Sequence, residues 1–507
     1  MIALLRPPMA IPRLDKLLMG LAEPDSLPHR GIAGLSHDSR AIEPGELFIA
    51  LAGQRSHGMR HAAEAIARGA AAIVFDPAGG GAELATAVGD VPCIPVVDLS
   101  QRLGLIADRY FGEPSKHLQI VGITGTNGKT SCSHFLADAL TGSKPAAVVG
   151  TLGWGIPGQL EPTLHTTPDA IALHRVLDRL RSRGIGPVAM EASSHGLEQG
   201  RLNGVRFAGA LFTNLSRDHL DYHGTMAGYL EAKLRLVRWP GLGFVAFNLD
   251  DGSADAIAAV TPPELRRIGY TRRRAAVEGK VEVLDADAVV HDAAGIRFDA
   301  RFGRASVTVQ APVFGEFNVE NLLGSLAVLL GLGCGLADAA RRLARVKPVP
   351  GRMERFSGPH GPTVVVDYAH TPDALEKALA SLRPHCAGAL WVVFGCGGNR
   401  DRGKRAQMGA VADRLADAIV LTDDNPRDED GDVIIGEVLQ GCRGAAVEVI
   451  RDRRHAIAHA VGRAGPADVV LVAGKGHETT QEVKGLLTPF NDCDVVCQLL
   501  AATGGRS

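Results

Sequence analysis

The sequence predicts an α/β protein of three domains, each built around a mainly parallel sheet. The chain has 507 residues, which is too long for a single hydrophobic core. Short apolar runs of strand type alternate with helical stretches through most of its length. One such run, Leu118 to Ile123, leads into a glycine loop and then a helix. We place the domains at residues 1–116, 117–346 and 347–507.

The first domain is predicted to be a small α/β unit. The apolar runs 46–51 and 71–75 are typical of strands, and the alanine-rich stretch 61–68 is typical of a helix. Two polar segments, 37–40 and 53–58, connect these elements. Polar glycine loops either bind ligands or simply turn the chain, and the residues alone favour simple connections.

The central domain is predicted to be P-loop ATPase-like. The strand ends in the loop G-T-N-G-K-T-S at 125–131, and good helix formers continue to about Leu140. Gly125 and Gly128 let the loop turn with its N–H groups facing inward, and a helix N-terminus favours an anion. A polyphosphate fits there, with Lys129 at its β- and γ-phosphates and the Thr130 hydroxyl on Mg²⁺.

The loop departs from the general pattern G-x-x-x-x-G-K-[ST], which has glycine where Ile123 stands. The alternative is a glycine turn at a strand–helix junction, with a lysine in solvent. The complete strand, loop and helix favour nucleotide binding.

Further strands of the central domain are expected at 187–190 and 208–213. Polar clusters follow them, at 191–195 and 214–219. Because the residues beyond the ends of parallel strands line one crevice, both clusters should lie beside the phosphate loop. The uncharged run from about Asn321 to Ala337 predicts a buried helix.

The third domain shows the clearest βα alternation and is predicted to be doubly wound and Rossmann-like. Its strands are expected at 363–367, 390–394, 418–421, 447–450 and 469–472. Polar or glycine-rich segments follow at 367–372, 395–400, 422–427 and 474–478. Their crowding at one sheet edge predicts a second binding surface.

Composition indicates an ordinary globular protein, with 46% hydrophobic and 22% charged residues. The net charge of −2 argues against general binding of nucleic acid or membrane surfaces. The eight cysteines are scattered without CxxC spacing, which favours a reduced, cytosolic setting. The first 20 residues contain three prolines and lack the apolar core of a signal peptide.

Six ordered motifs resemble those of the Mur ligases, and they span most of the chain. They are G-T-N-G-K-T-S at 125–131, E-A-S-S-H-G-L at 191–197, N-L-S-R-D-H-L-D-Y-H at 214–223, G-R-M-E at 351–354, D-Y-A-H-T-P-D-A-L at 367–375 and D-N-P-R at 424–427. The resemblance implies a cytoplasmic, three-domain, ATP-dependent amide ligase of peptidoglycan synthesis. Its reaction phosphorylates a D-Glu γ-carboxylate and transfers the acyl group to an amine. We expect a monomer that binds neither nucleic acid nor membrane.

The resemblance implies an ATP site and a Mg²⁺ site. The residues matched to ATP binding are Gly125, Thr126, Asn127, Gly128, Lys129, Thr130, Ser131, Asn318, Arg352, Asp367 and His370. The residues matched to catalysis are Lys129, Glu191, His219 and Lys233, and those matched to metal binding are Thr130, Glu191, His219 and Lys233. Cations are needed because an anionic carboxylate must approach an anionic phosphate.

Two of these assignments depend on the resemblance. A single histidine after a strand is more often structural, and the motif around His219 reverses that interpretation. From the residues alone, Lys233 is an exposed lysine in a helix over 226–236. The resemblance implies that it is carbamylated, which converts a cation into an anionic oxygen ligand for a metal.

The resemblance also implies two further substrates. UDP-N-acetylmuramoyl-L-Ala-D-Glu would be held by Ser39, His165, Thr166, Thr167, Ser193, Gln199 and Arg201, with the loop 53–56 at its uridine diphosphate end. meso-Diaminopimelate would be held by Arg400, Asp424, Asn425, Pro426, Arg427, Gly474 and Glu478.

Within this set, Arg427 would pair with the carboxylate that distinguishes diaminopimelate from lysine, and Glu478 would take the distal ammonium. The alternatives in the same class are a lysine-adding or D-Ala-D-Ala-adding ligase and a folylpolyglutamate synthetase. A nucleotide-binding regulator without catalysis is the alternative in another class.

Overall fold

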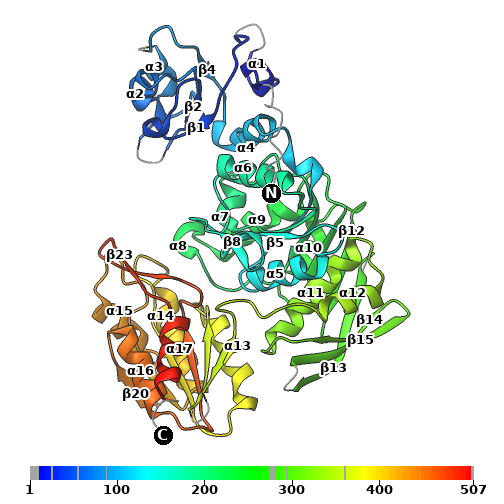
Figure 1. The fold of residues 1–507 in the computed structure, drawn as a ribbon, viewed down its shortest axis with the longest axis vertical. Coiled ribbons are helices and arrows are strands. Elements are labelled where there is room, and N and C mark those ends of the chain that lie inside the picture. Colours follow the sequence, from blue (N-terminus) through cyan, green and yellow to red (C-terminus); the bar gives the residue numbers. More distant parts are fainter. Residues whose placement is uncertain are drawn as a thin grey trace, which may run out of the picture.

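The computed structural model describes residues 11–23, 27–53, 56–86, 88–273, 280–292, 295–358, 361–444 and 446–503. Figure 1 shows an N-terminal domain, a central domain and a C-terminal domain following one another along the chain. Each of the three large sheets lies inside one of the predicted domains. The predicted three-domain α/β fold is therefore confirmed.

The N-terminal domain is a four-stranded parallel sheet in the order β1-β2-β3-β4. Strands β2 and β3 are fully buried and coincide with the predicted apolar runs. The elements are β1 Leu35–Ser36, β2 Leu47–Ala50, β3 Ala72–Phe75, β4 Cys93–Pro95, α1 Leu14–Leu17, α2 Ala62–Ala67, α3 Gly81–Ala85 and α4 Leu99–Tyr110, with 3₁₀ turns η2 Ser39–Ala41, η3 Gly58–His61 and η4 Pro114–His117.

The central domain contains an 11-stranded sheet in the order β15-β14-β13-β12-β11-β10-β5-β9-β6-β7-β8. Its parallel middle runs from β13 to β6, and antiparallel strands extend both edges. The strands are β5 Gln119–Thr124, β6 Ala147–Gly150, β7 Gly153–Ile156, β8 Gln159–Glu161, β9 Pro187–Glu191, β10 Phe207–Phe212, β11 Phe244–Asn248, β12 Arg266–Thr271, β13 Glu282–Asp292, β14 Gly295–Phe302 and β15 Ala305–Ala311.

Helices cover both faces of this sheet, so its middle strands are buried on both sides. The first core places α5 Lys129–Leu140, α11 Phe317–Gly331 and α12 Leu336–Leu343 on one face. The second core places α6 Ala170–Ser182, α7 Ser194–Glu198, α9 Met226–Val237 and α10 Ala254–Val260 on the other. The short helix α8 Leu220–His223 precedes α9.

The single buried helix predicted over 321–337 is in fact two helices. Helix α11 ends at Gly331 and α12 begins at Leu336. Gly333, with φ of +91°, lies just past the end of α11. Glycine adopts this left-handed conformation at little cost, and it commonly ends a helix.

The C-terminal domain is a doubly wound six-stranded sheet in the order β16-β17-β21-β18-β19-β20, parallel except at β16. Helices α13, α14 and α15 pack on one face, and α16 and α17 on the other. The elements are β16 Glu354–Ser357, β17 Thr363–Asp367, β18 Leu390–Phe394, β19 Ala418–Leu421, β20 Ala446–Val449, β21 Val469–Ala473, α13 Pro372–Leu382, η5 Arg383–His385, α14 Gly403–Leu415, α15 Gly431–Leu439, α16 Arg453–Arg463 and α17 Asp492–Thr503.

The predicted strands of this domain coincide with β17 to β21, with bounds that differ by at most one residue at either end. A separate antiparallel hairpin, β22 Thr480–Val483 with β23 Leu486–Pro489, was not predicted. Figure 1 shows β23 at the end of the C-terminal domain that faces the N-terminal domain.

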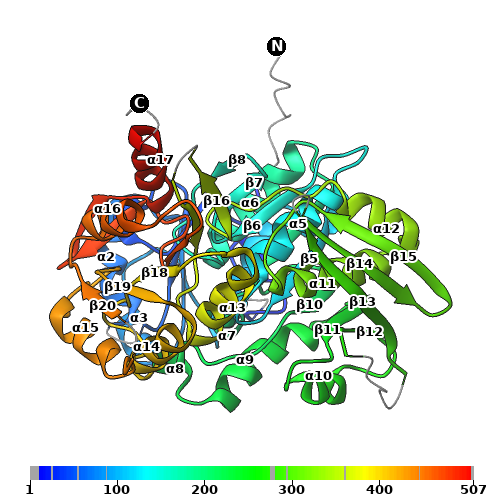
Figure 2. The ribbon, with the colours of Figure 1, turned by 90° about the horizontal axis from the view of Figure 1, so that it is seen from below.

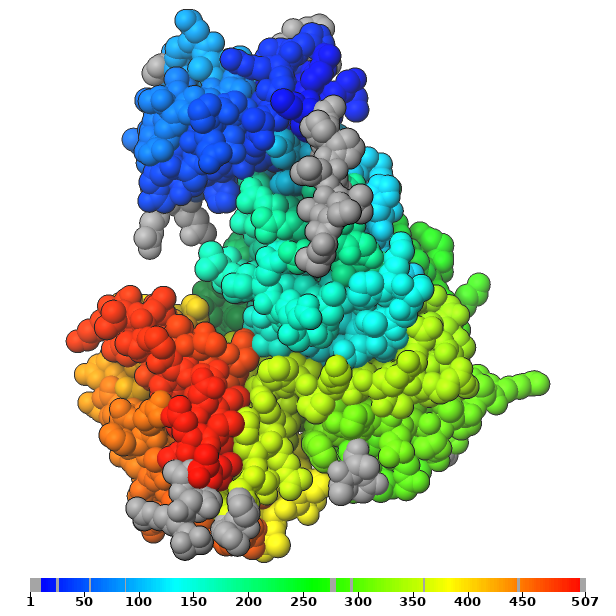
Figure 3. Space-filling model, in the orientation of Figure 1, coloured from blue at the N-terminus to red at the C-terminus, as the bar shows by residue number. Residues whose placement is uncertain are grey.

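The central and C-terminal domains meet at the candidate site. Seen from below in Figure 2, α13 lies on the side of the C-terminal domain that faces the central domain, and the Glu316 N–H at the start of α11 donates to Ser381 Oγ of α13 at 3.0 Å. Figure 3 shows an open recess between the N-terminal and C-terminal domains, with the central domain behind it. No helix among the described residues is long and apolar enough to cross a membrane.

Candidate active site

The phosphate loop joins β5 to α5, as predicted. Gly125 and Gly128 have φ of +137° and +85°. A Cβ at Gly125 would lie 1.9 Å from Thr213 Oγ1, so no larger residue fits there. Asn214 fixes the loop from the end of β10, since the Asn127 N–H donates to Asn214 Oδ1 (2.9 Å) and Asn214 Nδ2 donates to the Asn127 carbonyl (3.1 Å).

Two lysines converge on the loop carbonyl of Gly125. Lys129 Nζ donates to it at 2.9 Å and Lys233 Nζ at 2.7 Å. Lys233 is 1% exposed, which corrects the interpretation from the residues alone that it is a solvent-facing helix lysine. Burial lowers the pKa of both amines. The pKa of Lys233 is lowered well below its usual value, because the charge of Lys129 adds to the effect of burial. The carboxylate of Asp218 opposes the shift of both lysines. The fold therefore makes the Lys233 amine easier to deprotonate than a lysine in water.

Glu191, at the end of β9, is bonded to hydroxyl groups from two other segments. Thr130 Oγ1 donates to Glu191 Oε2 at 3.2 Å, and Thr151 donates from its N–H to Oε1 (2.9 Å) and from its hydroxyl to Oε2 (3.0 Å). Carboxylate and hydroxyl oxygens suit Mg²⁺, which is usually held by one or two carboxylates together with substrate phosphates. The pair Thr130 and Glu191 fits that ion. Within the described ranges, no three His, Cys, Asp or Glu side chains form a metal-binding group by themselves.

Asp218 is a buried carboxylate surrounded by basic side chains from two domains. Its side chain lies 3.3 Å from His219 Nε2, 3.6 Å from His370 Nε2 and 3.9 Å from Lys404 Nζ. Burial by itself would raise the pKa of Asp218, but the hydrogen bond from His370 and the nearby charges hold that pKa well below its usual value. Burial lowers the pKa of His219 to about 3 despite Asp218, so this imidazole is neutral near pH 7, as a metal ligand must be.

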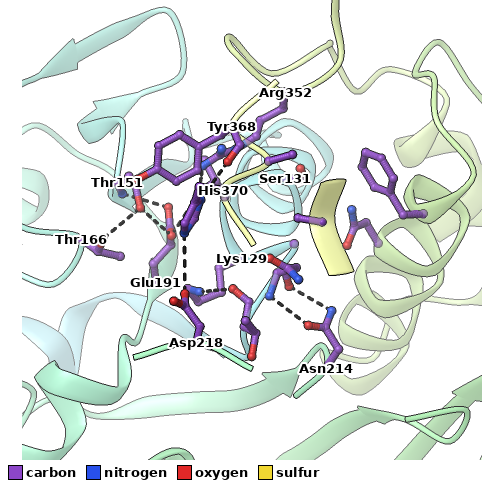
Figure 4. A pocket seen from close by; sticks show the side chains of 18 of the residues that line it. Lys129, Ser131, Thr151, Thr166, Glu191, Asn214, Asp218, Arg352, Tyr368 and His370 are labelled. Carbon is purple, nitrogen blue, oxygen red and sulfur yellow. Dashed lines mark hydrogen bonds and ion pairs between the residues drawn. The ribbon is translucent and has the colours of Figure 1, made fainter. Parts of the chain in front are cut away.

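These groups line a cavity of about 210 Å³ between the central and C-terminal domains, here named the phosphate cavity (Figure 4). The C-terminal domain contributes Arg352, whose Nη2 donates to Thr130 Oγ1 at 3.2 Å. The Arg352 guanidinium lies 4.1 Å from the centre of the Tyr368 ring. Predicted residues on the cavity wall are Thr126, Asn127, Gly128, Lys129, Thr130, Ser131, Glu191, His219, Lys233, Arg352, Asp367 and His370.

Two predicted ATP residues are not on this wall: Gly125 lies in the phosphate loop next to it, and Asn318 lies behind it. Asn318 accepts a hydrogen bond from Asn321 Nδ2 at 2.8 Å, and it is Asn321 that lines the cavity. Asn318 therefore does not border the cavity itself, but it holds the side chain of Asn321, which does.

A second cavity of about 410 Å³ adjoins the first, here named the adjoining cavity. The two share Asn214, Glu320 and Lys377. The other lining residues are Asn248, Asp250, Asp251, Arg272 and Arg273. Of these eight residues, only Asn214 belongs to a segment that the sequence placed beside the phosphate loop.

Three of the residues predicted to hold the dipeptide, Thr166, Thr167 and Ser193, lie on the two segments beside Glu191. Thr166 and Ser193 line the phosphate cavity. Thr167 is buried behind them, where its hydroxyl donates to the Glu191 carbonyl at 2.9 Å and accepts from the Ser193 N–H at 3.0 Å. These contacts set the position of the segment that precedes α6.

The other predicted dipeptide residues lie further out. Arg201 donates to Gln199 Oε1 from Nε (3.0 Å) and Nη2 (2.7 Å), and from Nη1 to the Thr167 carbonyl (2.8 Å). His165 is exposed at the surface. Ser39 is in the N-terminal domain, where its hydroxyl donates to Glu64 Oε2 at 2.6 Å. Gln54 and Arg55 of the predicted 53–56 loop lie outside the described residues.

The segment D-N-P-R follows β19 and is bonded to the segment that follows β21. Asn425 Nδ2 donates to Glu478 Oε2 at 2.9 Å. Lys475, which is fully buried, donates to Asn425 Oδ1 (3.0 Å) and to Glu478 Oε2 (2.7 Å). One carboxylate oxygen of Glu478 thus has two donors, which fixes its orientation.

The other residues predicted to bind the amine lie on the same two segments or on the loop after β18. Gly474 has φ of +115°, and a Cβ there would lie 2.6 Å from Asp424 Oδ2, so glycine is required. Pro426 is buried, and Arg427 Nη1 donates to the Gly398 carbonyl at 2.9 Å. Arg400 is exposed. The structure therefore brings D-N-P-R, Gly474 and Glu478 together at one sheet edge, as the second binding surface requires.

The sequence interpretation missed several residues of the phosphate cavity. Thr151 follows the end of β6, and Asp218 lies inside a quoted motif, so the strand-end rule pointed to both. Tyr229 lies one helical turn before Lys233, with its ring centre 4.3 Å from the Lys233 Nζ. No local pattern identified Tyr229.

Three family profiles match the chain. The Mur ligase family, catalytic domain, matches residues 31–111; the Mur ligase middle domain matches 123–329; and the Mur ligase, glutamate ligase domain matches 351–476. These matches fall on the N-terminal, central and C-terminal domains in turn.

Similar proteins extend over nearly the whole chain. A UDP-N-acetylmuramoyl-L-alanyl-D-glutamate–2,6-diaminopimelate ligase of Alkalilimnicola ehrlichii is 48% identical over 97% of this chain and 99% of its own. The ligase of that name from Pseudomonas aeruginosa is 45% identical over 93% of this chain and 95% of its own. A solved structure of a ligase with the same name is 36% identical, has a TM-score of 0.69, and covers 97% of this chain and 99% of its own. The resemblance found in the six motifs is thereby confirmed: the chain belongs to the Mur ligase family.

Proposed function

We propose that this chain is an ATP-dependent ligase that joins meso-diaminopimelate to the D-Glu γ-carboxylate of UDP-N-acetylmuramoyl-L-Ala-D-Glu. The reaction belongs to peptidoglycan synthesis and takes place in the cytoplasm, on a monomer. The observation that carries the proposal is the D-N-P-R segment, with Arg427, in the domain that closes the phosphate cavity. Similar chains at 45–48% identity bear the name of this ligase, which supports the choice of substrates.

ATP would lie across the two cavities. Its phosphates fit the loop between β5 and α5, where Lys129 and the start of the helix supply positive charge. The nucleoside end of ATP fits the adjoining cavity, because this cavity is continuous with the phosphate cavity. Asn214, Glu320 and Lys377 line both cavities. The amide, carboxylate and guanidinium groups of the adjoining cavity can bond a base and a ribose.

Thr130 and Glu191 would hold one Mg²⁺, and His219 with a carbamylated Lys233 would hold a second. When bound, these ions reduce the repulsion between the phosphate and carboxylate anions. Carbamylation of Lys233 requires a neutral amine, and burial favours that form at this position. The carbamate would place an anion beside the Lys129 ammonium, which attracts it, whereas a second ammonium group there would repel it.

The chemistry then needs two transfers. The D-Glu γ-carboxylate oxygen attacks the γ-phosphorus of ATP, the bond to the bridging oxygen breaks and ADP leaves. The amine nitrogen attacks the acyl carbon, loses a proton, and phosphate leaves as the amide forms. Thr166 and Ser193 lie where they can orient the carboxylate, and Lys129 and Arg352 approach the phosphates from two domains. Because Arg352 belongs to the C-terminal domain, domain closure brings it into the site.

The amine would be selected by the residues around D-N-P-R. The Arg427 guanidinium suits the carboxylate that diaminopimelate has and lysine lacks. The orientation of Glu478 by Lys475 and Asn425 leaves its other carboxylate oxygen for the distal ammonium of the substrate. If lysine were the substrate, Arg427 would have no substrate carboxylate to bind.

The test is product formation by the purified protein with ATP, Mg²⁺ and the nucleotide dipeptide. ADP and phosphate release that depends jointly on the dipeptide and meso-diaminopimelate supports the proposal. Transfer of ¹⁸O from the γ-carboxylate to phosphate supports the acyl phosphate. Turnover with D-Ala-D-Ala or with a folate and glutamate would identify one of the related ligases, and binding of ATP without any turnover would identify a regulator.

A further inference from the structure

The hairpin β22–β23 is attached to the backbone of the D-N-P-R segment. The Arg427 N–H donates to the Glu482 carbonyl at 3.1 Å, and the Lys484 N–H donates to the Arg427 carbonyl at 2.7 Å. The Glu482 N–H also donates to Asn425 Oδ1 at 3.0 Å, and Gln481 Nε2 donates to the Asp424 carbonyl at 2.8 Å. The hairpin and the segment therefore form one bonded unit.

This attachment holds Arg427 in a costly backbone conformation. Its φ is +54°, in the left-handed region that residues with a Cβ rarely adopt. The hairpin bonds both the N–H and the carbonyl of Arg427, one on each side of the unfavourable φ angle. Such a conformation persists only when its surroundings determine it, and it is found most often at functional sites.

The hairpin also contacts the guanidinium of Arg427. Glu482 Oε2 lies 3.1 Å from Arg427 Nε, while Arg427 Nη1 donates to the Gly398 carbonyl at 2.9 Å. Two different edges of the planar group are therefore fixed by the protein. Among the residues that the structure describes, Nη2 has no hydrogen-bond partner. The guanidinium of Arg427 is therefore held in one orientation, and its Nη2 can still donate to a substrate carboxylate.

We propose that Glu482 is a positioning residue that holds the Arg427 guanidinium in the orientation that binds the distal carboxylate of the amine substrate. This inference rests on the proposed function and extends it to a residue outside the predicted site. A competing role would be that Glu482 occupies Arg427 in place of the substrate carboxylate. The contacts argue against competition for two reasons. Glu482 and Arg427 are joined through their backbones, and Glu482 lies at Nε, whereas the Nη2 hydrogen on the Nη1 side of the guanidinium points away from Nε.

The test compares Glu482→Ala and Glu482→Gln with the wild type. Glu482→Ala removes the acceptor, and Glu482→Gln keeps an acceptor oxygen without the charge. The control is Glu448→Ala, which removes an ion pair with Arg463 on the surface of the same domain. Circular dichroism and the thermal midpoint show whether each variant is folded. The readouts are the KM values of meso-diaminopimelate, ATP and the nucleotide dipeptide, and the preference for diaminopimelate over L-lysine.

For Glu482→Ala we expect the KM of diaminopimelate to rise about three- to fivefold, the effect of losing one partly exposed ion pair, with the other two KM values unchanged. The preference over lysine should fall by a similar factor, and Glu482→Gln should lie between Glu482→Ala and the wild type. The proposal is overturned if both variants lower the KM of diaminopimelate, which would show competition. It is also overturned if all three KM values rise together, or if none changes. Failure of the proposed function is separate, because it would appear as a wild type that does not use diaminopimelate.

Discussion

Arg217 and Asp401 form a bidentate ion pair between the central and C-terminal domains. Arg217 Nε lies 3.1 Å from Asp401 Oδ2, and Nη2 lies 3.2 Å from Oδ1. Arg217 precedes Asp218 and His219 in the loop after β10, and Asp401 follows the predicted amine-binding residue Arg400. The pair thus connects the loop beside the metal-binding residues with the loop beside the amine.

We expect Asp401→Asn to weaken this closed arrangement. A partly exposed ion pair contributes ~0.5–1 kcal/mol, so kcat/KM for diaminopimelate should fall about two- to fivefold. The single variants Arg217→Asp and Asp401→Arg should also lower kcat/KM. The double variant, in which the two charges are exchanged, should recover most of that loss in a double-mutant cycle. Arg301→Ala breaks an ion pair on the distant β13–β14 hairpin and serves as the control. Additive losses in the cycle would mean that the two side chains do not act together.

Lys129→Ala should abolish turnover while the nucleotide dipeptide still binds. The variant removes the amine that approaches the phosphates, and we expect a fall in kcat of about 10³-fold or more, as for other groups that stabilise transition-state charge. Calorimetric titration measures dipeptide binding in the same protein. Lys144→Ala, at an exposed lysine of the same domain, is the matched control. A Lys129→Ala enzyme with full activity would remove Lys129 from the phosphate site.

Lys233→Ala should be nearly inactive and should regain part of its activity with a short carboxylic acid such as propionate. The acid would supply the anionic oxygen that the carbamate provides. Mass spectrometry of the intact wild type, with and without bicarbonate at mildly alkaline pH, measures the modification directly. An unchanged rate in Lys233→Ala would exclude Lys233 from the metal site, and inactivity without rescue would leave only its contact with Gly125 to explain the loss.

His134 should make the fold sensitive to acid. This residue of α5 is 6% exposed, and burial, with a contribution from Arg352, lowers the pKa of its imidazole to about 4. Because the unfolded chain binds the proton more tightly, stability is retained above the ordinary pKa of about 6.5 and falls as the pH drops from there towards 4. Linkage gives a loss of about 2 kcal/mol between pH 7.5 and pH 5.

Urea unfolding of the wild type and His134→Asn at those two pH values measures this effect. The asparagine cannot titrate, so its free energy of unfolding should change about 2 kcal/mol less than that of the wild type. An equal change in the two proteins would show that other groups cause the acid sensitivity.

Much of the fold was predictable because buried parallel strands give continuous apolar runs that end at polar residues. The strands β17, β18 and β19 begin and end at the predicted residues for that reason. The antiparallel edges were not predictable in the same way. Strand β7, Gly153–Ile156, contains two glycines, and the β22–β23 hairpin is largely exposed, so neither has the pattern of a buried strand.

The candidate site was predictable where a side chain follows a strand or belongs to a motif, as Glu191 and Lys129 do. The burial of Lys233 was not, because it depends on the phosphate loop covering one face of α9. The contact between Glu482 and Arg427 was also hidden, since it joins a hairpin to a loop 55 residues earlier in the chain. Local patterns carry no information about such tertiary contacts.

Selection of diaminopimelate by the ligase can be measured in a competition assay. The protein is given ATP, Mg²⁺, UDP-N-acetylmuramoyl-L-Ala-D-Glu and equal concentrations of meso-diaminopimelate and L-lysine, and the nucleotide tripeptides are separated by mass. We expect the diaminopimelate product alone in the wild type. A wild type that forms the lysine product in comparable amount would contradict selection of diaminopimelate.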